Sequence, residues 1–147
     1  MTIVNPSADG LCTVVFIGIL NGNGTSLLIR RGPYWGLPKR EVSRPIGINE
    51  LIGEIIDGYT SITPFMIDTE HVGTYPDYWD DKPAEHQIYW LRNVRTRASI
   101  DLSYAKLMTL SPRLGDEFDI TAKTFARYLE ARGRLRPQTR QPVQVAA

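Results

Sequence analysis

The stretch TSLLIRRGPYWGLPKREVSRPIGINELIGEIIDGYTSI, residues 25–62, decides the fold. It begins with an apolar strand that ends in Arg30 and Arg31 and continues into a loop of glycine, proline, aromatic and basic residues to about Gly47. Apolar residues then recur at helical spacing, which predicts an amphipathic helix from a cap at Asn49 to about Tyr59. Ligands are often bound where a rigid element meets such a loop.

The elements outward from this stretch are mostly strands. Residues 11–20 are rich in Val, Ile and Phe, and the turn signal of residues 21–24 predicts that they form a hairpin with residues 25–31. Residues 64–74 and 86–94 predict two further strands, and residues 99–102 a short one. Asp119 is a plausible N-cap for a last helix that ends at Gly133. Residues 75–83 predict a long loop of aromatic and acidic residues.

Length and composition indicate one domain. The chain has 147 residues, of which 42% are hydrophobic, enough for a core without disulfides or metal. We expect a single domain over residues 1–133 and a disordered basic tail over residues 134–147. The only cysteine, Cys12, lies in an apolar strand, which predicts a buried thiol and a cytoplasmic protein. No apolar run is long enough to span a membrane, so we expect no membrane partner.

The strand, loop and helix of residues 25–62 resemble the Nudix family. Its box is a Gly, five residues, a Glu, seven residues and then Arg-Glu-U-x-Glu-Glu-x-Gly-U, where U is apolar. Trp35, Leu37 and Pro38 match the lead-in to the box, and an alignment without gaps places Ile56 and Ile62 on the two apolar positions. The resemblance covers roughly residues 10–94 and implies an α/β fold: an α/β/α sandwich with a mixed β-sheet.

In the same alignment, the charged and glycine positions of the box are occupied by other residues. It puts Arg40 on the first Gly, Ile46 on the first Glu, Glu54 and Ile55 on Arg-Glu, Gly58 and Tyr59 on Glu-Glu, and Ser61 on the last Gly. The family uses those glutamates to bind divalent metal ions that assist cleavage of a pyrophosphate. The resemblance therefore implies the fold while the metal-binding residues are missing, and we expect no metal cofactor.

Other carboxylates are candidates for replacing them. Glu50, Glu54 and Asp57 form one stripe of the predicted helix, opposite its apolar face, so we favour a solvated stripe and expect these acids to be exposed and Ile55 and Tyr59 to be buried. A one-residue slip would put Glu54 and Asp57 on two glutamate positions, which makes them the candidate catalytic residues. The loop acids Asp80, Asp81 and Glu85, with Asp77 and His86, are a second set. For this set we favour a hydrated loop.

Basic and aromatic residues around the central loop are the candidate ligand-binding residues. Guanidinium groups suit phosphate because they donate parallel hydrogen bonds and remain charged. Loop aromatics can cover a ring. The candidates are Arg30, Arg31, Trp35, Lys39, Arg40, Tyr78 and Trp79.

Three functions follow. The first is a Nudix-like domain that binds a phosphorylated or anionic, ring-bearing small molecule without hydrolysis. The second is an active Nudix-type diphosphate hydrolase that uses Mg or Mn with Glu54, Asp57 or the acids of residues 80–85. The third is a protein-interaction scaffold. The net charge of +1 and the sparse basic tail do not predict nucleic-acid binding, and the sequence leaves open whether the chain forms a homodimer.

Overall fold

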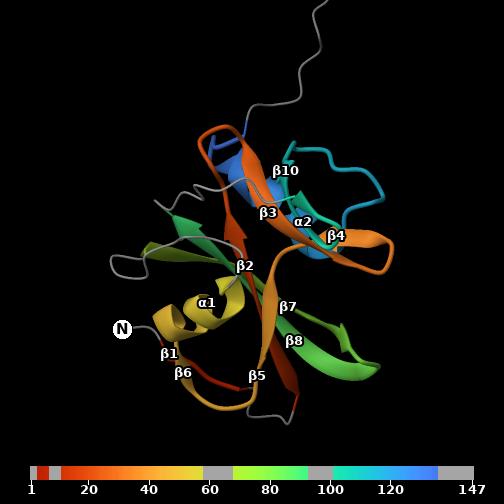
Figure 1. Ribbon diagram of the computed structural model, residues 1–147. Helices are drawn as coiled ribbons and strands as arrows, with labels where there is room; N and C mark the ends of the chain where they lie inside the picture. Colours follow the sequence, from red (N-terminus) through yellow and green to blue (C-terminus); the bar gives the residue numbers. More distant parts are fainter. Residues whose placement is uncertain (1–2, 7–10, 58–67, 93–100, 136–147) are drawn as a thin grey trace, which may run out of the picture.

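The computed structural model describes residues 3–6, 11–57, 68–92 and 101–135. Within these ranges the chain forms a mixed α+β fold of two helices and ten strands (Figure 1). The strands are β1 Ile3–Val4, β2 Cys12–Ile19, β3 Thr25–Arg31, β4 Tyr34–Gly36, β5 Lys39–Val42, β6 Ile46–Gly47, β7 Asp68–Trp79, β8 Lys82–Arg92, β9 Asp101–Leu102 and β10 Ala105–Thr109. The helices are α1 Ile48–Ile56 and α2 Ile120–Ala131.

A mixed sheet with the strand order β5-β2-β8-β7 forms the centre of the fold. β2 pairs with β8 in parallel and with β5 in antiparallel orientation, and β7 and β8 form an antiparallel hairpin. Val15 and Ile17 of β2 lie in one apolar cluster with α1, whereas Val14 and Phe16 lie in another with α2. Because successive side chains of a strand point to opposite faces, the helices cover opposite faces, which is the expected α/β/α sandwich.

A second sheet, with the strand order β4-β3-β10-β9, lies beside α2. Its pairs are all antiparallel. Trp35 of β4 forms an isolated bridge with Phe118, next to the start of α2. In the described part of the chain, no helix has the length and apolar character needed to cross a membrane.

The hairpin predicted for residues 11–31 is wrong. The turn itself forms, because the Gly24 N–H donates to the Asn21 carbonyl at 2.9 Å and the Asn21 N–H donates to the Thr25 carbonyl at 2.8 Å. Only Leu20 and Ser26 form a bridge, after which β2 enters the central sheet and β3 the second sheet. The turn reverses the chain, but β2 is buried on both faces and takes its partners from distant strands.

Two predicted loops are also wrong. Residues 32–47 contain β4, β5 and β6, which are short strands whose glycines and prolines lie at or between their ends. Residues 75–83 continue β7 to Trp79 and then turn through Asp80 and Asp81, whose φ angles are 50° and 62°. Positive φ at both central residues is the requirement of a type I′ hairpin turn, and aspartate tolerates it better than most residues.

The two helices lie close to their predicted positions. α2 begins as expected at Asp119, whose carboxylate accepts from the N–H groups of Thr121 and Ala122, and Gly133 follows its end with a φ of 69°. α1 follows Gly47 rather than a cap at Asn49, and Gly47 provides no side-chain cap. The predicted burial of Tyr59 and the first part of the 64–74 strand lie outside the described residues.

Candidate functional site

The α2 side of the central sheet carries a group of aromatic and ionisable side chains, the His86 cluster: Phe16, Lys39, Tyr75, Asp77, Trp79 and His86. Strand register brings them together. Phe16 of β2 lies opposite Lys39 of β5, and His86 of β8 lies opposite Tyr75 of β7. Tyr75, Asp77 and Trp79 alternate along β7, so they share one face. The cluster therefore uses all four strands of the sheet.

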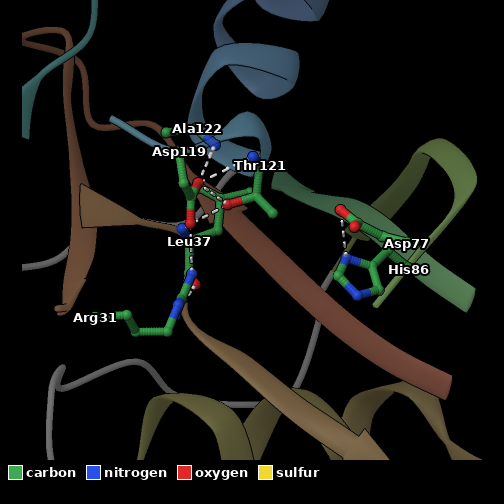
Figure 2. Close-up of polar contacts among 7 residues, drawn as sticks. All are labelled: Arg31, Leu37, Asp77, His86, Asp119, Thr121 and Ala122. Atoms are coloured by element: carbon green, nitrogen blue, oxygen red, sulfur yellow. Dashed lines mark hydrogen bonds and ion pairs between the residues drawn. The ribbon is translucent and has the colours of Figure 1, made fainter. Parts of the chain in front are cut away.

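His86 is the buried centre of this cluster. It is 5% exposed, and its ring centroid lies 5.1 Å from that of Phe16, 5.4 Å from that of Tyr75 and 6.4 Å from that of Trp79. Among the residues that the structure describes, neither ring nitrogen has a hydrogen-bond partner of good geometry. The polar groups beside the ring are the Tyr78 backbone and Oδ2 of Asp77, which is 3.9 Å from Nδ1 (Figure 2). Burial lowers the pKa of His86 and outweighs the opposing charge of Asp77, so the ring is neutral at pH 7.

The phenol of Tyr75 is unpartnered as well. Its oxygen is buried without a hydrogen-bond partner in the described part of the chain. Burial raises the pKa of Tyr75, and the charges of Asp77 and Asp119 add to the effect. Buried polar atoms in native proteins are nearly always hydrogen-bonded, and leaving one unpaired costs on the order of 1 to 3 kcal/mol. The unpaired groups on His86 and Tyr75 lie next to each other, so together they offer hydrogen-bonding capacity to a small molecule.

An ion pair between Arg31 and Asp119 borders the cluster. Nη2 of Arg31 lies 3.0 Å from Oδ2 of Asp119, and Nη1 donates to the Leu37 carbonyl at 3.0 Å (Figure 2). The other oxygen of Asp119 caps α2 by accepting from Thr121 N and Ala122 N at 2.9 and 3.1 Å. A Cβ at Gly36 would clash with Oδ2 of Asp119, so this ion pair requires glycine there. The bridge fastens the 35–38 lead-in to α2.

Lys39 and Trp79 close the cluster from the opposite side. Nζ of Lys39 lies 4.0 Å from the centroid of the Trp79 ring, within cation–π distance. Burial lowers the pKa of Lys39, and the positive charge of Arg31 adds to this effect, whereas Asp80 and Glu41 oppose it. The ammonium group is therefore held in a partly desolvated place beside another cation.

The predicted ligand-binding residues divide between different surfaces, because neighbours along a strand point in opposite directions. Arg31, Lys39 and Trp79 lie at the His86 cluster, whereas their sequence neighbours Arg30, Arg40 and Tyr78 point away from it. Arg30 is exposed and donates through Nε to the Gly32 carbonyl at 3.1 Å, and Tyr78 is 68% exposed. Trp35 is half-buried beneath Lys106, whose Nζ is 5.7 Å from its ring.

The acids of α1 lie on the other side of the sheet. Glu54 pairs with Arg40 at 3.3 Å, and Glu50 lies 3.9 Å from Arg44. Glu50 and Asp57 are exposed as expected, but Glu54 is only about one third exposed, at 34%. Ile55 is 5% exposed and belongs to the core, which confirms its predicted burial.

A small pocket of about 80 Å³ lies beside these acids and is lined by Arg40, Glu41, Val42, Ser43, Arg44, Ile46, Leu51 and Glu54. The described residues include no group of three or more His, Cys, Asp or Glu side chains that could hold a metal ion. Of the loop acids, Asp80 and Asp81 form the hairpin turn, while Glu85 accepts from the Gln87 amide at 2.8 Å. Gly58 and Tyr59 lie outside the described residues.

The interpretation of His86 as part of a hydrated loop is wrong, because His86 lies in a buried position of β8. The alternation of Ala84, His86, Ile88 and Trp90 is the sequence signal that places it on the buried face. Tyr75 and Asp119 were not among the predicted site residues. Cys12 is only half-buried, and burial together with Glu41 raises the pKa of its thiol to about 11.

No protein-family model and no curated protein matches the sequence. Solved structures do match. The E. coli ORF135 protein superposes with a TM-score of 0.62 at 12% identity, over 88% of this chain and 95% of that one. The MutT protein from Methanosarcina mazei gives 0.57 at 15% identity, with 87% and 96% covered, and a putative Nudix hydrolase family member from Chromobacterium violaceum gives 0.56 at 15%, with 84% and 80% covered. Likeness at this identity establishes fold, not activity.

Proposed function

We propose that this chain, which has a Nudix-like fold, binds a phosphorylated or otherwise anionic, ring-bearing small molecule at the His86 cluster and does not hydrolyse it. The proposal rests on the buried polar groups of His86 and Tyr75, which lack a hydrogen-bond partner of good geometry among the described residues, lie among aromatic rings and are flanked by the cations of Lys39 and Arg31. Pockets for small molecules commonly combine aromatic walls with a few polar groups.

The chemistry of the cluster suits a heterocycle. A neutral imidazole offers one donor and one acceptor, and a phenol offers both, so His86 and Tyr75 can satisfy the polar edge of a ring. Phe16 and Trp79 can contact its faces. Lys39 attracts an anionic substituent, and each charged hydrogen bond contributes on the order of 1.5 to 3 kcal/mol when desolvated. Nucleotides combine these features.

The state of α1 supports binding without metal-dependent hydrolysis. In the gapless alignment Ile55 occupies a position of a metal-binding glutamate, and this side chain packs in the core against the sheet. Glu54 and Glu50, the nearest acids on the helix, already have arginine partners. Loss of the box carboxylates removes the metal ligands and also removes the repulsion between protein and phosphate that a metal ion offsets.

The test is calorimetry with a panel of nucleotides, comparing wild type with His86→Phe. Phenylalanine keeps a ring in the site and removes the unpaired nitrogens, so it should leave stability unchanged or raised while affinity falls about tenfold. His71→Phe, the same change at the exposed histidine of β7, is the control. We expect wild-type binding to persist in EDTA and to weaken with added salt. Binding that disappears on chelation, or that is unaltered in His86→Phe, contradicts the proposal.

An active hydrolase is the second candidate, because partly buried Glu54 borders the small pocket together with Arg40 and Arg44. Such an enzyme needs Mg or Mn, and Glu54→Gln should abolish turnover of nucleoside diphosphate derivatives, since an amide cannot replace a carboxylate that binds metal or activates water. Turnover that survives in Glu54→Gln would show that Glu54 is not the catalytic carboxylate, and Asp57, Asp80, Asp81 and Glu85 would remain as candidates. No metal-dependent turnover in wild type excludes this candidate for the substrates used.

A further inference from the structure

Lys39 and Trp79 meet from opposite edges of the central sheet. Lys39 lies on β5 and Trp79 on β7, which are the outer strands of the order β5-β2-β8-β7. Three strand spacings separate outer strands, roughly 14 Å along the sheet, yet the Lys39 ammonium lies 4.0 Å from the Trp79 ring. The two side chains therefore reach across the central strands, which carry Phe16 and His86.

This contact is the outer layer of the cluster. Phe16 is 2% exposed and His86 is 5% exposed, whereas Lys39 and Trp79 are half-buried. Trp79 also contacts His86 edge-to-face, with an angle of 70° between the ring planes and the centroids 6.4 Å apart. Both residues lie on edge strands, so their side chains can move without breaking the pairing of β2 with β8.

We propose that Lys39 and Trp79 form a latch over His86 and Tyr75 and that this latch selects the ligand class, which is a flat ring carrying an anionic group in the same molecule. The inference rests on the proposed function and extends it. The ring replaces the Lys39 ammonium on the face of Trp79, and the anion becomes the new partner of that ammonium. The polar edge of the ring then reaches His86 and Tyr75.

A ligand that carries only the ring, or only the anionic group, binds with an uncompensated free-energy cost. A neutral ring that stacks on Trp79 displaces an ammonium that is partly desolvated and close to Arg31, so the cation loses its partner. A lone phosphate can pair with Lys39, but it leaves the Trp79 face without its cation and does not reach His86. A cation–π contact of this kind is worth about 0.5 to 2 kcal/mol, which a ligand with both groups recovers.

The latch can be tested without a ligand, because the chain has only two histidines. Diethyl pyrocarbonate modifies neutral imidazole, and mass spectrometry separates the two sites. His71 is exposed and serves as the internal control in every sample. Lys39→Met keeps the aliphatic stem and removes the charge, so we expect the modification rate of His86 to rise about fivefold, a factor equivalent to about 1 kcal/mol of cation–π stabilisation, while His71 is unaffected.

Lys106→Met is the matched control, since it also removes a lysine charge from the face of a tryptophan, that of Trp35 in the second sheet. An unchanged His86 rate in Lys39→Met, or an equal rise in Lys106→Met, overturns the latch. Lys39→Ala provides a second variant that removes the stem as well, and circular dichroism of all three verifies the fold. An unfolded variant is recognised because its spectrum changes.

The ligand class is tested by calorimetry with adenosine 5′-monophosphate, adenosine and inorganic phosphate. We expect the monophosphate to bind at least tenfold more tightly than either fragment, and Lys39→Met to reduce the difference between monophosphate and adenosine. An unreduced difference in Lys39→Met overturns the selection by the latch. If none of the three binds, the proposed function fails for nucleotides and the ligand class with it, whereas the His86 modification rates still decide whether the latch exists.

Discussion

The two faces of the central sheet are packed with different chemistry. Under α1 every buried member of the apolar cluster is aliphatic, among them Ile17, Leu51 and Ile55. Under α2 the cluster contains Phe16, Trp90 and Phe125, and beyond the helix it gives way to His86 and Tyr75 with their unpaired polar atoms. α1, on which the sequence alignment places most of the Nudix box, packs an aliphatic face against the sheet, and the unpaired polar atoms of the described residues His86 and Tyr75 lie on the other face.

The largest expected effect comes from restoring a carboxylate to α1. Ile55→Glu places a charge in the aliphatic cluster and should lower the free energy of unfolding by about 3 to 5 kcal/mol, because the buried residues described around it are all aliphatic. Urea denaturation at pH 7 measures this. Asn49→Glu is the matched control, since Asn49 is exposed on the same helix and should change stability little. Equal losses of unfolding free energy in the two variants would show that the side of α1 that carries Ile55 is not a buried face.

A medium effect is expected at the junction of β4 and α2. Asp119→Ala removes both the N-cap and the partner of Arg31, and it should cost about 1 to 2 kcal/mol of unfolding free energy. Asp119→Asn keeps a capping oxygen and removes only the charge, so it should cost less than half as much. Urea denaturation of the pair gives the comparison. A cost in Asp119→Asn as large as in Asp119→Ala would assign the stabilisation to the ion pair instead of the cap.

The smallest expected effect is the pH dependence contributed by His86. Its pKa in the folded protein lies below the ordinary value of 6.5, so the unfolded chain binds more protons at mildly acidic pH. Stability should therefore fall as pH decreases below about 6.5, by at most about 1.4 kcal/mol at pH 5.5. Urea denaturation at pH 7.5 and 5.5 should show a smaller difference in His86→Gln than in wild type. His71→Gln is the exposed control, and the same reduction there would point away from His86.

The sequence predicted the features that depend on local pattern. The spacing of Ala122, Phe125, Ala126 and Leu129 and the cap at Asp119 predicted α2, and the spacing of Leu51, Ile52 and Ile55 predicted the buried face of α1. Features that depend on contacts between distant parts of the chain could not be predicted from the sequence. The parallel pairing of β2 with β8 joins residues about 70 positions apart in sequence, as in Cys12 with Ala84, and local periodicity contains no information on such pairing.

The site was predicted in part for the same reason. The sequence predicted the basic and aromatic residues around residues 30–40 as one group, whereas strand alternation places Lys39 and Arg40 on opposite faces of the sheet. The opposite orientation of these two side chains can be predicted only when residues 39–42 are known to form a strand. The C-terminal part of β7 was not predicted either, because the turn at Asp80 and Asp81 lacks the glycine that usually occurs in a two-residue hairpin turn.

The bridge between Arg31 and Asp119 also bears on how the chain folds. It joins residues 88 positions apart, so the loop that it closes carries a large entropic cost, and contacts of this range slow folding. The local hairpin β7–β8 can form early, whereas the docking of α2 onto the lead-in at residues 35–38 must wait until both ends are present. We therefore expect the amide hydrogens of Thr121 and Ala122 to gain protection late in a pulse-labelling refolding experiment, after those of β8.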